Sequence, residues 1–433
     1  MRSDLVSVLS EGTLSDHVEE CAAFISRALP EAERPAFIQE LHAQAAKADE
    51  ASDADTRAQI SRAVVADLVK KTPGMIEGTD REVEGVFNLL ITLIRNNYRE
   101  EEARDFLLHL VGVVSETGAT AGQRVAVKYR ILANVFNTLP AHSAVRLEVF
   151  EALLALTAHN GDLDYLNSAI QALPSWLVQW KVSPEQVHSC LDKVADALRS
   201  SERAEYSDRA FEIELMHLRW VSQETSLSKE VRLATAENVV AAALRQPKLF
   251  DFGDIVREPV VAELNGTPLF SLLKIFVGGS RSDLDKWLAE SESASTLERL
   301  SLDKDGLVHK MQLLDLSDLC AGSVSSEVTY AQIAETLAVD ESDVETWVID
   351  VIRAGLVSGK LSQVKRSFRV YRSAQRSFEK PQWEALEKRL VQWQSSISSL
   401  KETVRKADAQ LNQRTLLETE KANAPESTAA PAS

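Results

Sequence analysis

The side chains of this chain that could carry out chemistry are its histidines, one serine–lysine pair and its cysteines. No two histidines stand four residues apart beside a glutamate, which is the helical spacing typical of a zinc site. Ser226 and Lys229 have Ser-x-x-Lys spacing, but the motifs that accompany this pair in enzymes are missing, as are the glycine-rich phosphate-binding motifs and GxSxG. We therefore expect no catalytic residue, no cofactor and no metal ligand. The eight histidines are His17, His42, His109, His142, His159, His188, His217 and His309.

The cysteines and the N-terminus indicate a reducing compartment. Cys21, Cys190 and Cys320 are far apart, and each lies among apolar residues at helical spacing, which favours buried thiols over disulfides or metal ligands. The N-terminus lacks a basic segment followed by an apolar core, and no stretch approaches the ~18 apolar residues of a membrane span. We expect a cytoplasmic protein without a membrane partner.

A local run of cations stands out against a net charge of -17. It has no acidic residue between Ser358 and Arg376, and it ends at Arg376. The members that we expect to contact RNA or a partner are Lys360, Lys365, Arg366, Arg369 and Arg372. One interpretation is a solvated surface, or cations that meet acidic neighbours in an assembly. The other is direct contact with an RNA backbone, which the overall negative charge does not prevent because phosphates respond to local potential.

The cations follow a helix-turn-helix pattern. Residues 330–337 place Ile333, Ala334 and Leu337 on one face, and a second helix begins near Glu341 with Val344, Val348, Val351 and Ile352 on its apolar side. Gly355 ends that helix, and residues 356–361 and 367–371 form two short strands, which completes a winged helix. The second helix carries four carboxylates, which argue against DNA as a partner: Glu341, Asp343, Glu345 and Asp350.

The rest of the chain predicts a mainly α fold. Amphipathic segments follow one another from residue 83, separated by breakers such as Pro174, and residues 297–319 form the last long helix before the winged helix. Helices in such succession pack as a helical-repeat (HEAT/TPR-like) solenoid, followed here by the winged-helix domain and a long C-terminal helix. Residues 40–57 have little to bury beyond Leu41, which favours a weakly held connector.

The C-terminal helix carries a heptad seam. Apolar residues alternate at spacings of three and four from Trp383 to Leu411, which is typical of a helix that bundles with others. Packing against its own domain is the alternative for the first turns. The residues expected at a partner interface are Trp383, Leu386, Leu390, Trp393, Ile397, Leu400 and Val404.

These patterns divide the chain into five parts. We expect a partly flexible N-terminal helical region over 1–80 and helical repeats over 81–200. A domain follows over 201–376, with a helical part at 201–322 and the winged helix at 323–376, and the bundling helix covers 377–420. The tail, 421–433, contains almost no large apolar side chain and should be disordered.

Four segments carry a resemblance to the PCI-domain family, found in the proteasome lid, the COP9 signalosome and eukaryotic translation initiation factor 3. They are LFDFGDIVREPVVAEL (249–264), TPLFSLLKIFVGG (267–279), DVETWVIDVIRAGLVSGKLSQ (343–363) and FEKPQWEALEKRLVQWQSSISSLKETV (378–404). Within that family the chain is most similar to the subunit m group of the initiation factor.

The resemblance implies a non-catalytic scaffold. Members of the family join other PCI and MPN subunits through their winged-helix edges and a bundle of terminal helices. The assembled factor binds the small ribosomal subunit and supports recruitment of mRNA and initiator tRNA. A scaffold subunit of the proteasome lid or the COP9 signalosome stays open as an alternative, as does a winged-helix module that binds RNA.

Overall fold

The structure is a computed structural model that describes residues 12–74, 78–116, 124–201, 203–324, 326–376 and 380–422. The chain forms two compact units. Unit 1 comprises residues up to Gln246 together with Ile255–Phe270, and unit 2 comprises Pro247–Asp254 together with the chain from Ser271 onward. Most of the predicted disordered tail, and the junction at 377–379, lie outside the described residues.

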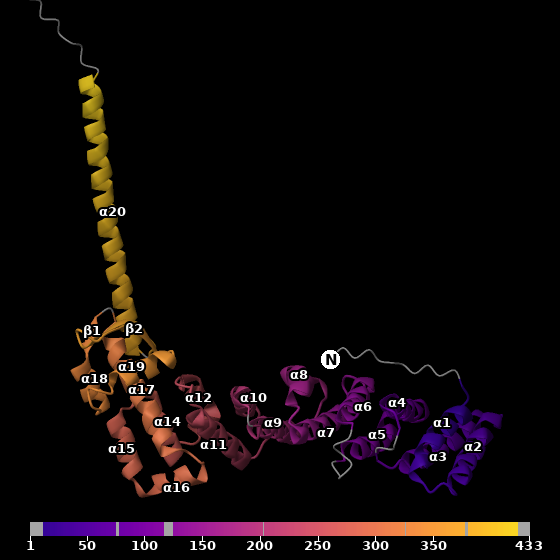
Figure 1. Ribbon diagram of the computed structural model, residues 1–433. Coiled ribbons are helices and arrows are strands. Elements are labelled where there is room, and N and C mark those ends of the chain that lie inside the picture. The colour runs from indigo at the N-terminus through magenta and orange to yellow at the C-terminus, as the bar shows by residue number, and fades with distance from the viewer. Residues whose placement is uncertain are drawn as a thin grey trace, which may run out of the picture. The chain divides into compact units, whose positions relative to one another are not determined.

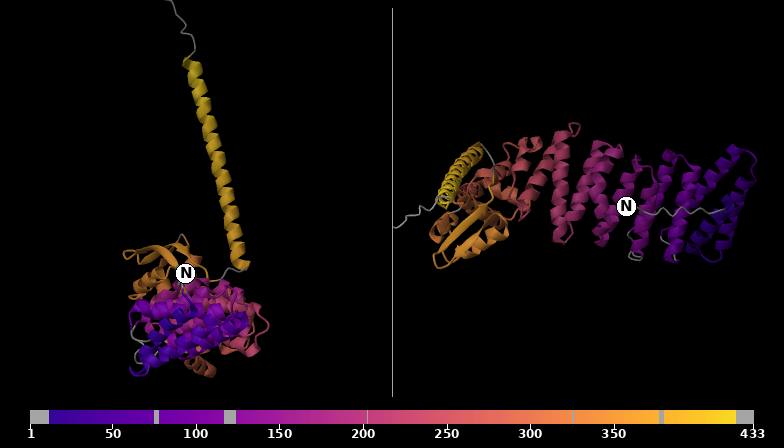
Figure 2. Two further views of the ribbon diagram at one scale, coloured as in Figure 1. Left: turned by 90° about the vertical axis from the view of Figure 1, so that its right-hand side faces the viewer. Right: turned by 90° about the horizontal axis from the view of Figure 1, so that it is seen from above.

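Unit 1 is an array of antiparallel helices that follow one another in chain order (Figures 1 and 2). Local signals set their first residues: Thr13, Thr79 and Ser183 each form a capping box with the residue three positions on, as predicted for Ser183. The elements are α1 (Leu14–Ile25), η1 (Ser26–Ala28), α2 (Arg34–Glu50), α3 (Ala54–Lys70), α4 (Asp80–Asn97), α5 (Glu100–Ser115), α6 (Val125–Thr138), α7 (Val145–Asn160), η2 (Leu163–Leu166), α8 (Asn167–Gln179), α9 (Pro184–Arg199), α10 (Ala204–Gln223), α11 (Lys229–Arg245) and α13 (Pro259–Ala262). The predicted helical solenoid is confirmed.

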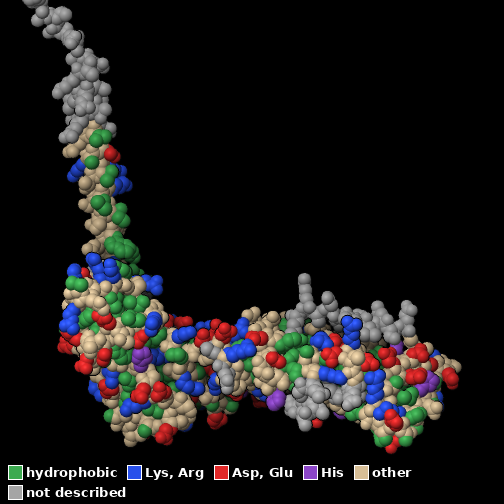
Figure 3. All heavy atoms as spheres, in the orientation of Figure 1, with side chains coloured by type: hydrophobic (Ala, Val, Ile, Leu, Met, Phe, Trp, Pro, Cys, Tyr) green, Lys and Arg blue, Asp and Glu red, His purple; other side chains and the backbone are tan. Residues whose placement is uncertain are grey.

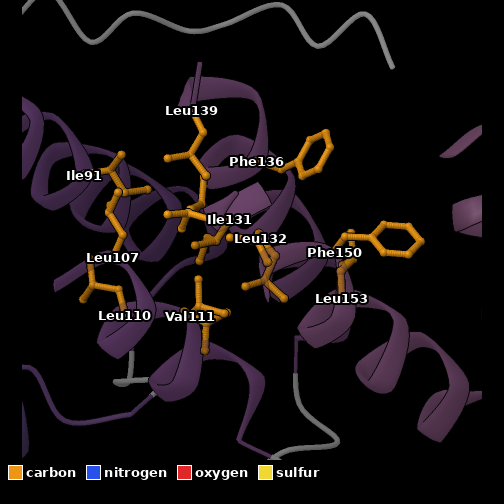
Figure 4. Packing of buried hydrophobic residues seen from close by; sticks show 14 of the residues in the cluster. Ile91, Leu107, Leu110, Val111, Ile131, Leu132, Phe136, Leu139, Phe150 and Leu153 are labelled. Carbon is orange, nitrogen blue, oxygen red and sulfur yellow. The ribbon is translucent and has the colours of Figure 1, made fainter. Parts of the chain in front are cut away.

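A continuous apolar core runs through these helices (Figure 4). Ile91 of α4, Leu107 of α5 and Ile131 of α6 belong to the same cluster, together with Phe150 of α7. Each helix therefore buries its apolar stripe against the helices before and after it, so that neighbouring repeats share one core.

Two expectations for unit 1 are wrong. Residues 40–57 are not a loose connector: α2 runs to Glu50, and its Leu41, Ala45 and Ala48 are fully buried against α1 and α3. Small alanine side chains let the helices approach closely, so the segment buries a face although it contains few large apolar residues. Pro174 does not separate two elements but lies inside α8, where the helix continues with one backbone donor fewer.

Unit 2 continues with α15 (Arg281–Ala289), α16 (Ser291–Arg299) and α17 (Lys304–Gly322), while α12 (Gly253–Arg257) and α14 (Pro268–Gly278) contain the boundaries between the units. The single long helix predicted over 297–319 is wrong, because the chain breaks between α16 and α17. Ser301 has a φ of 50° there, and the Asp303 side chain accepts from the backbone amides of Asp305 and Gly306 to start α17.

The winged helix is confirmed. It consists of β1 (Glu327–Thr329), α18 (Tyr330–Leu337), α19 (Val344–Arg353), β2 (Val357–Ser362) and β3 (Ser367–Ser373), with the sheet in the order β1-β3-β2 and both pairings antiparallel. Sequence patterns missed β1, which has three residues and a single buried side chain, Val328. On α19, Val344, Val348 and Val351 are buried as expected, but Ile352 is 37% exposed. The terminal helix is α20 (Lys380–Ala422).

All three cysteines are free and buried, as predicted. Burial raises the pKa of the Cys190 and Cys320 thiols to about 12, which keeps them protonated. Among the described residues, no helix is long and apolar enough to cross a membrane.

A buried lysine gives unit 2 a predicted pH dependence. Lys310 on α17 is 4% exposed, its Nζ lies 4.8 Å from the centre of the Phe252 ring, and burial lowers its pKa to about 7. In the unfolded chain a lysine keeps its proton up to about pH 10.4, so folding releases a proton between these values and stability rises with pH across them. We expect the free energy of unfolding of the wild type, relative to Lys310→Met, to be higher at pH 9 than at pH 7. Urea unfolding of both proteins measures this, and a constant difference would contradict the prediction.

Candidate interaction surfaces

The wing, which is the hairpin formed by β2 and β3, is tight and has one open edge. β3 is the central strand, so among the residues that the structure describes β2 has a partner on only one side. Gly355, with a φ of 75°, ends α19 and turns the chain into β2. Gly359 lets the strands approach closely, because a Cβ there would overlap the carbonyl oxygen of Arg369 and the Phe368 ring. The open edge of β2 is a surface on which another strand could pair.

The five predicted wing cations fall into two groups. Lys365 lies 3.6 Å from a carboxylate oxygen of Glu327, and Arg366 lies 3.0 Å from one of Glu341. Among the ion pairs that the described residues form, none involves the other three, which are exposed: Lys360, Arg369 and Arg372. Lys360 is the cross-strand partner of Arg369, so two like charges stand opposite each other on the hairpin. Figure 3 shows Lys and Arg side chains gathered at the strand end of unit 2.

Two carboxylates of α19, Glu345 and Asp350, contact groups of their own domain. Glu345 accepts from the Tyr330 hydroxyl at 3.2 Å and from the Gln363 side chain at 2.8 Å, and Asp350 lies 3.7 Å from Arg353. Glu345 therefore links α19 to α18 and to the hairpin, while Glu341, which precedes α19, pairs with Arg366 of the hairpin. The helix that would enter a DNA groove in other winged helices therefore carries internal acidic contacts here.

Arg376, at the end of the run of cations, is part of the interior. Its side chain is 6% exposed, and its Nη2 lies 2.8 Å from Asp315 and 2.5 Å from Asp318 of α17. Its Nη1 donates to the carbonyl oxygen of Gly279 at 2.9 Å. Burial raises the pKa of Asp315, while Arg376 and the amide of Arg281 act to lower it. Arg376 therefore fixes the end of the winged helix to α17, four residues before α20 begins.

The heptad seam lies on the exposed surface of α20. From Trp383 to Leu411, every side chain that the structure describes is exposed, and Figure 3 shows hydrophobic side chains along this helix. The exposed fractions are Trp383 60%, Leu386 37%, Leu390 53%, Trp393 64%, Ile397 64%, Leu400 65%, Val404 58% and Leu411 67%. A row of this length is unusual on a monomeric surface and is typical of a helix that packs against other chains.

One group of three metal-capable side chains comes together among the described residues: His188, Asp192 and His217. The first two lie one turn apart on α9, and the third comes from α10. Burial lowers the pKa of His188; burial acts to raise that of Asp192, but the nearby imidazoles hold it below its ordinary value. Sequence spacing missed this group because its members come from two helices.

Comparisons with known proteins agree with these features. The PCI-domain family model matches residues 293–372, and the family model described as "eIF3 subunit M, C-terminal helix" matches residues 376–404. Eukaryotic translation initiation factor 3 subunit M of Aspergillus terreus is 30% identical over 415 residues, covering 94% of this chain and 88% of that protein. The proteins of the same name from Aspergillus clavatus and Schizosaccharomyces pombe are each 29% identical, over 412 residues (92% and 85% of the two chains) and 335 residues (76% and 78%).

Proposed function

The chain belongs to the family of eukaryotic translation initiation factor 3 subunit M, and from that premise we propose that it acts as a non-catalytic scaffold of this factor. It is a PCI-domain subunit with a role in translation initiation. In the proposal, α20 bundles with terminal helices of other PCI subunits, and the open edge of β2 meets a neighbouring winged helix. The assembled factor carries the chain to the small ribosomal subunit in the cytoplasm and supports recruitment of mRNA and initiator tRNA.

The observation that carries the proposal is the exposed seam of α20. Its apolar side chains from Trp383 to Val404 coincide with the segment that matches the subunit M terminal-helix family. Residues that only stabilised this chain would be buried within it, whereas these are exposed over more than half of their surface at most positions. The seam therefore has the chemistry of a surface that other helices cover.

Identity of the partners is the direct test. The full chain is affinity-purified from its own cells at moderate salt, and the proteins that stay bound are identified by mass spectrometry. We expect initiation-factor subunits and small-ribosomal-subunit proteins. Subunits of the proteasome lid or the COP9 signalosome would keep the scaffold and replace the complex, and the absence of any PCI partner would contradict the proposal.

The domain division belongs to the same proposal. Residues 81–200 act as the helical repeats, 201–376 as the PCI domain and 377–420 as the bundling helix. Limited proteolysis should release α20 from the isolated chain first, because its described side chains make an exposed helix, and should spare it in the assembled factor. Equal protection in both states would argue against this division.

RNA contact through the wing is a second candidate. The observation that favours it is the group Lys360, Arg369 and Arg372, which stand exposed without an acidic partner among the described residues. Like charges on opposite strands destabilise a hairpin unless an anion lies near them. Phosphate groups of RNA would supply that anion.

Removing these charges should weaken RNA binding and not assembly. We expect Lys360→Ala, Arg369→Ala and Arg372→Ala together to lower crosslinking of the assembled factor to RNA. The slope of log affinity against log salt should decrease by roughly 0.7 for each phosphate that the protein no longer neutralises. The matched control is Lys365→Ala with Arg366→Ala, whose charges are already paired with Glu327 and Glu341 and should change crosslinking little. Equal decreases in the two variants would refute a specific role for the exposed group.

A further inference from the structure

Between α9 and α10, three side chains form a closed triangle. His188 Nδ1 lies 2.9 Å from His217 Nε2. His188 Nε2 lies 3.2 Å from one carboxylate oxygen of Asp192, and His217 Nδ1 lies 3.3 Å from the other. The His217 side chain is 2% exposed, His188 is 21% exposed and Asp192 is 50% exposed, so Asp192 is the member of the triangle that solvent reaches most.

With both imidazoles neutral, the triangle contains two ring protons for three contacts between its members. Each neutral imidazole carries a single ring proton, whereas each of the three sides needs a proton or a cation between its atoms to be attractive. The carboxylate of Asp192 attracts the two protons to the nitrogens that face it, His188 Nε2 and His217 Nδ1. The two remaining nitrogens then direct lone pairs at each other across 2.9 Å.

A third proton would fill this gap only by giving one of the two imidazoles a positive charge. A cation that accepts two nitrogen lone pairs satisfies both atoms, and imidazole nitrogens are preferred ligands of zinc and its neighbours in the periodic table.

We propose that His188 Nδ1 and His217 Nε2 bind a divalent cation of the zinc class, with Asp192 holding the outer N–H group of each ring. Such a carboxylate behind a ligating imidazole fixes the tautomer and orients the ring. Tetrahedral zinc with bonds of about 2.0–2.1 Å places two nitrogens about 3.4 Å apart, so the rings need to separate by about half an ångström and to turn until both lone pairs point at the ion. In this proposal water supplies the remaining ligands, and the ion fastens α9 to α10.

The test uses the full chain after treatment with a chelator. Isothermal titration with Zn²⁺ at pH 7.5 should show one site, Co²⁺ should give the visible absorption of a nitrogen-ligated ion, and Zn²⁺ should raise the melting temperature. His188→Gln should abolish the site. Asp192→Asn should lower the affinity by about 10–100-fold, the effect of losing an orienting carboxylate. Because His217 is buried, replacing it would disturb the packing of α9 against α10. His188→Gln is therefore the variant that tests whether the site binds zinc.

His42→Gln is the matched control. His42 lies 3.4 Å from Glu19, so it too is an imidazole beside a carboxylate on a neighbouring helix, but among the described residues it belongs to no group of three metal-capable side chains. We expect this variant to bind Zn²⁺ as the wild type does. Unchanged binding by His188→Gln, or no binding by a natively folded wild type, would overturn the proposal. In the second case, an imidazolium seen by NMR at pH 7.5 would identify the triangle as a shared-proton network instead.

Discussion

Trp393→Ala combined with Ile397→Ala should remove the chain from its complex and leave its own fold intact. Both side chains are 64% exposed, so truncating them takes nothing from the chain's core. Alanine has the highest helix propensity, so α20 should persist. Buried anchors at protein interfaces typically cost about 2 kcal/mol or more each on truncation, and two such costs correspond to about a thousandfold weaker binding.

Co-purification with initiation-factor subunits measures this effect, and circular dichroism of the isolated chain checks the fold. The matched control is Ser395→Ala with Glu402→Ala, on the polar face of the same helix, and it should assemble normally. Truncation after Arg376 removes the whole helix and should abolish assembly as well. If the double seam variant assembles like the wild type while the truncation does not, the helix contributes through another face, and the heptad argument is wrong.

Arg376→Ala is expected to have the largest effect on stability. The substitution leaves Asp315, whose side chain is 10% exposed, beside Asp318 with no guanidinium between them. Removing one partner of a buried ion pair typically costs about 3–5 kcal/mol, because the remaining charge is left uncompensated. Thermal and urea unfolding of the isolated chain would measure the destabilisation, which should appear in unit 2.

Two further variants show whether the destabilisation by Arg376→Ala comes from the loss of the buried ion pairs or from the loss of any cation in this segment. Arg376→Lys keeps the positive charge but not the planar fork that reaches both carboxylates and the Gly279 carbonyl, so its destabilisation should be intermediate. Arg372→Ala removes an exposed cation four residues earlier and should change stability by no more than about 0.5 kcal/mol. If Arg376→Ala behaved like Arg372→Ala, the buried ion pairs would be energetically neutral and the attachment argument would be wrong.

Features that depend on neighbours along the chain could be predicted from sequence. The capping box at Ser183, the heptad spacing from Trp383 and the valines of α19 all depend on periods of three to four residues, which local patterns display. Local sequence patterns failed where burial depends on how closely neighbouring helices pack. Alanine-rich α2 has little large apolar surface, yet it is buried because α1 and α3 come close enough to cover small side chains.

Sequence alone determined the class of this protein: successive amphipathic helices, a winged helix and a heptad seam follow from the spacing of apolar residues, which is a local property of the chain. Only the tertiary structure decided which charges meet. It paired Lys365 with Glu327 and Arg366 with Glu341, left Lys360 opposite Arg369, and buried Arg376 against α17. It also joined His217 to His188 and Asp192. The pairs His188–His217 and Arg376–Asp315 join residues 29 and 61 positions apart in the chain. Electrostatic and coordination energies depend on distances in space, which spacing in sequence does not set.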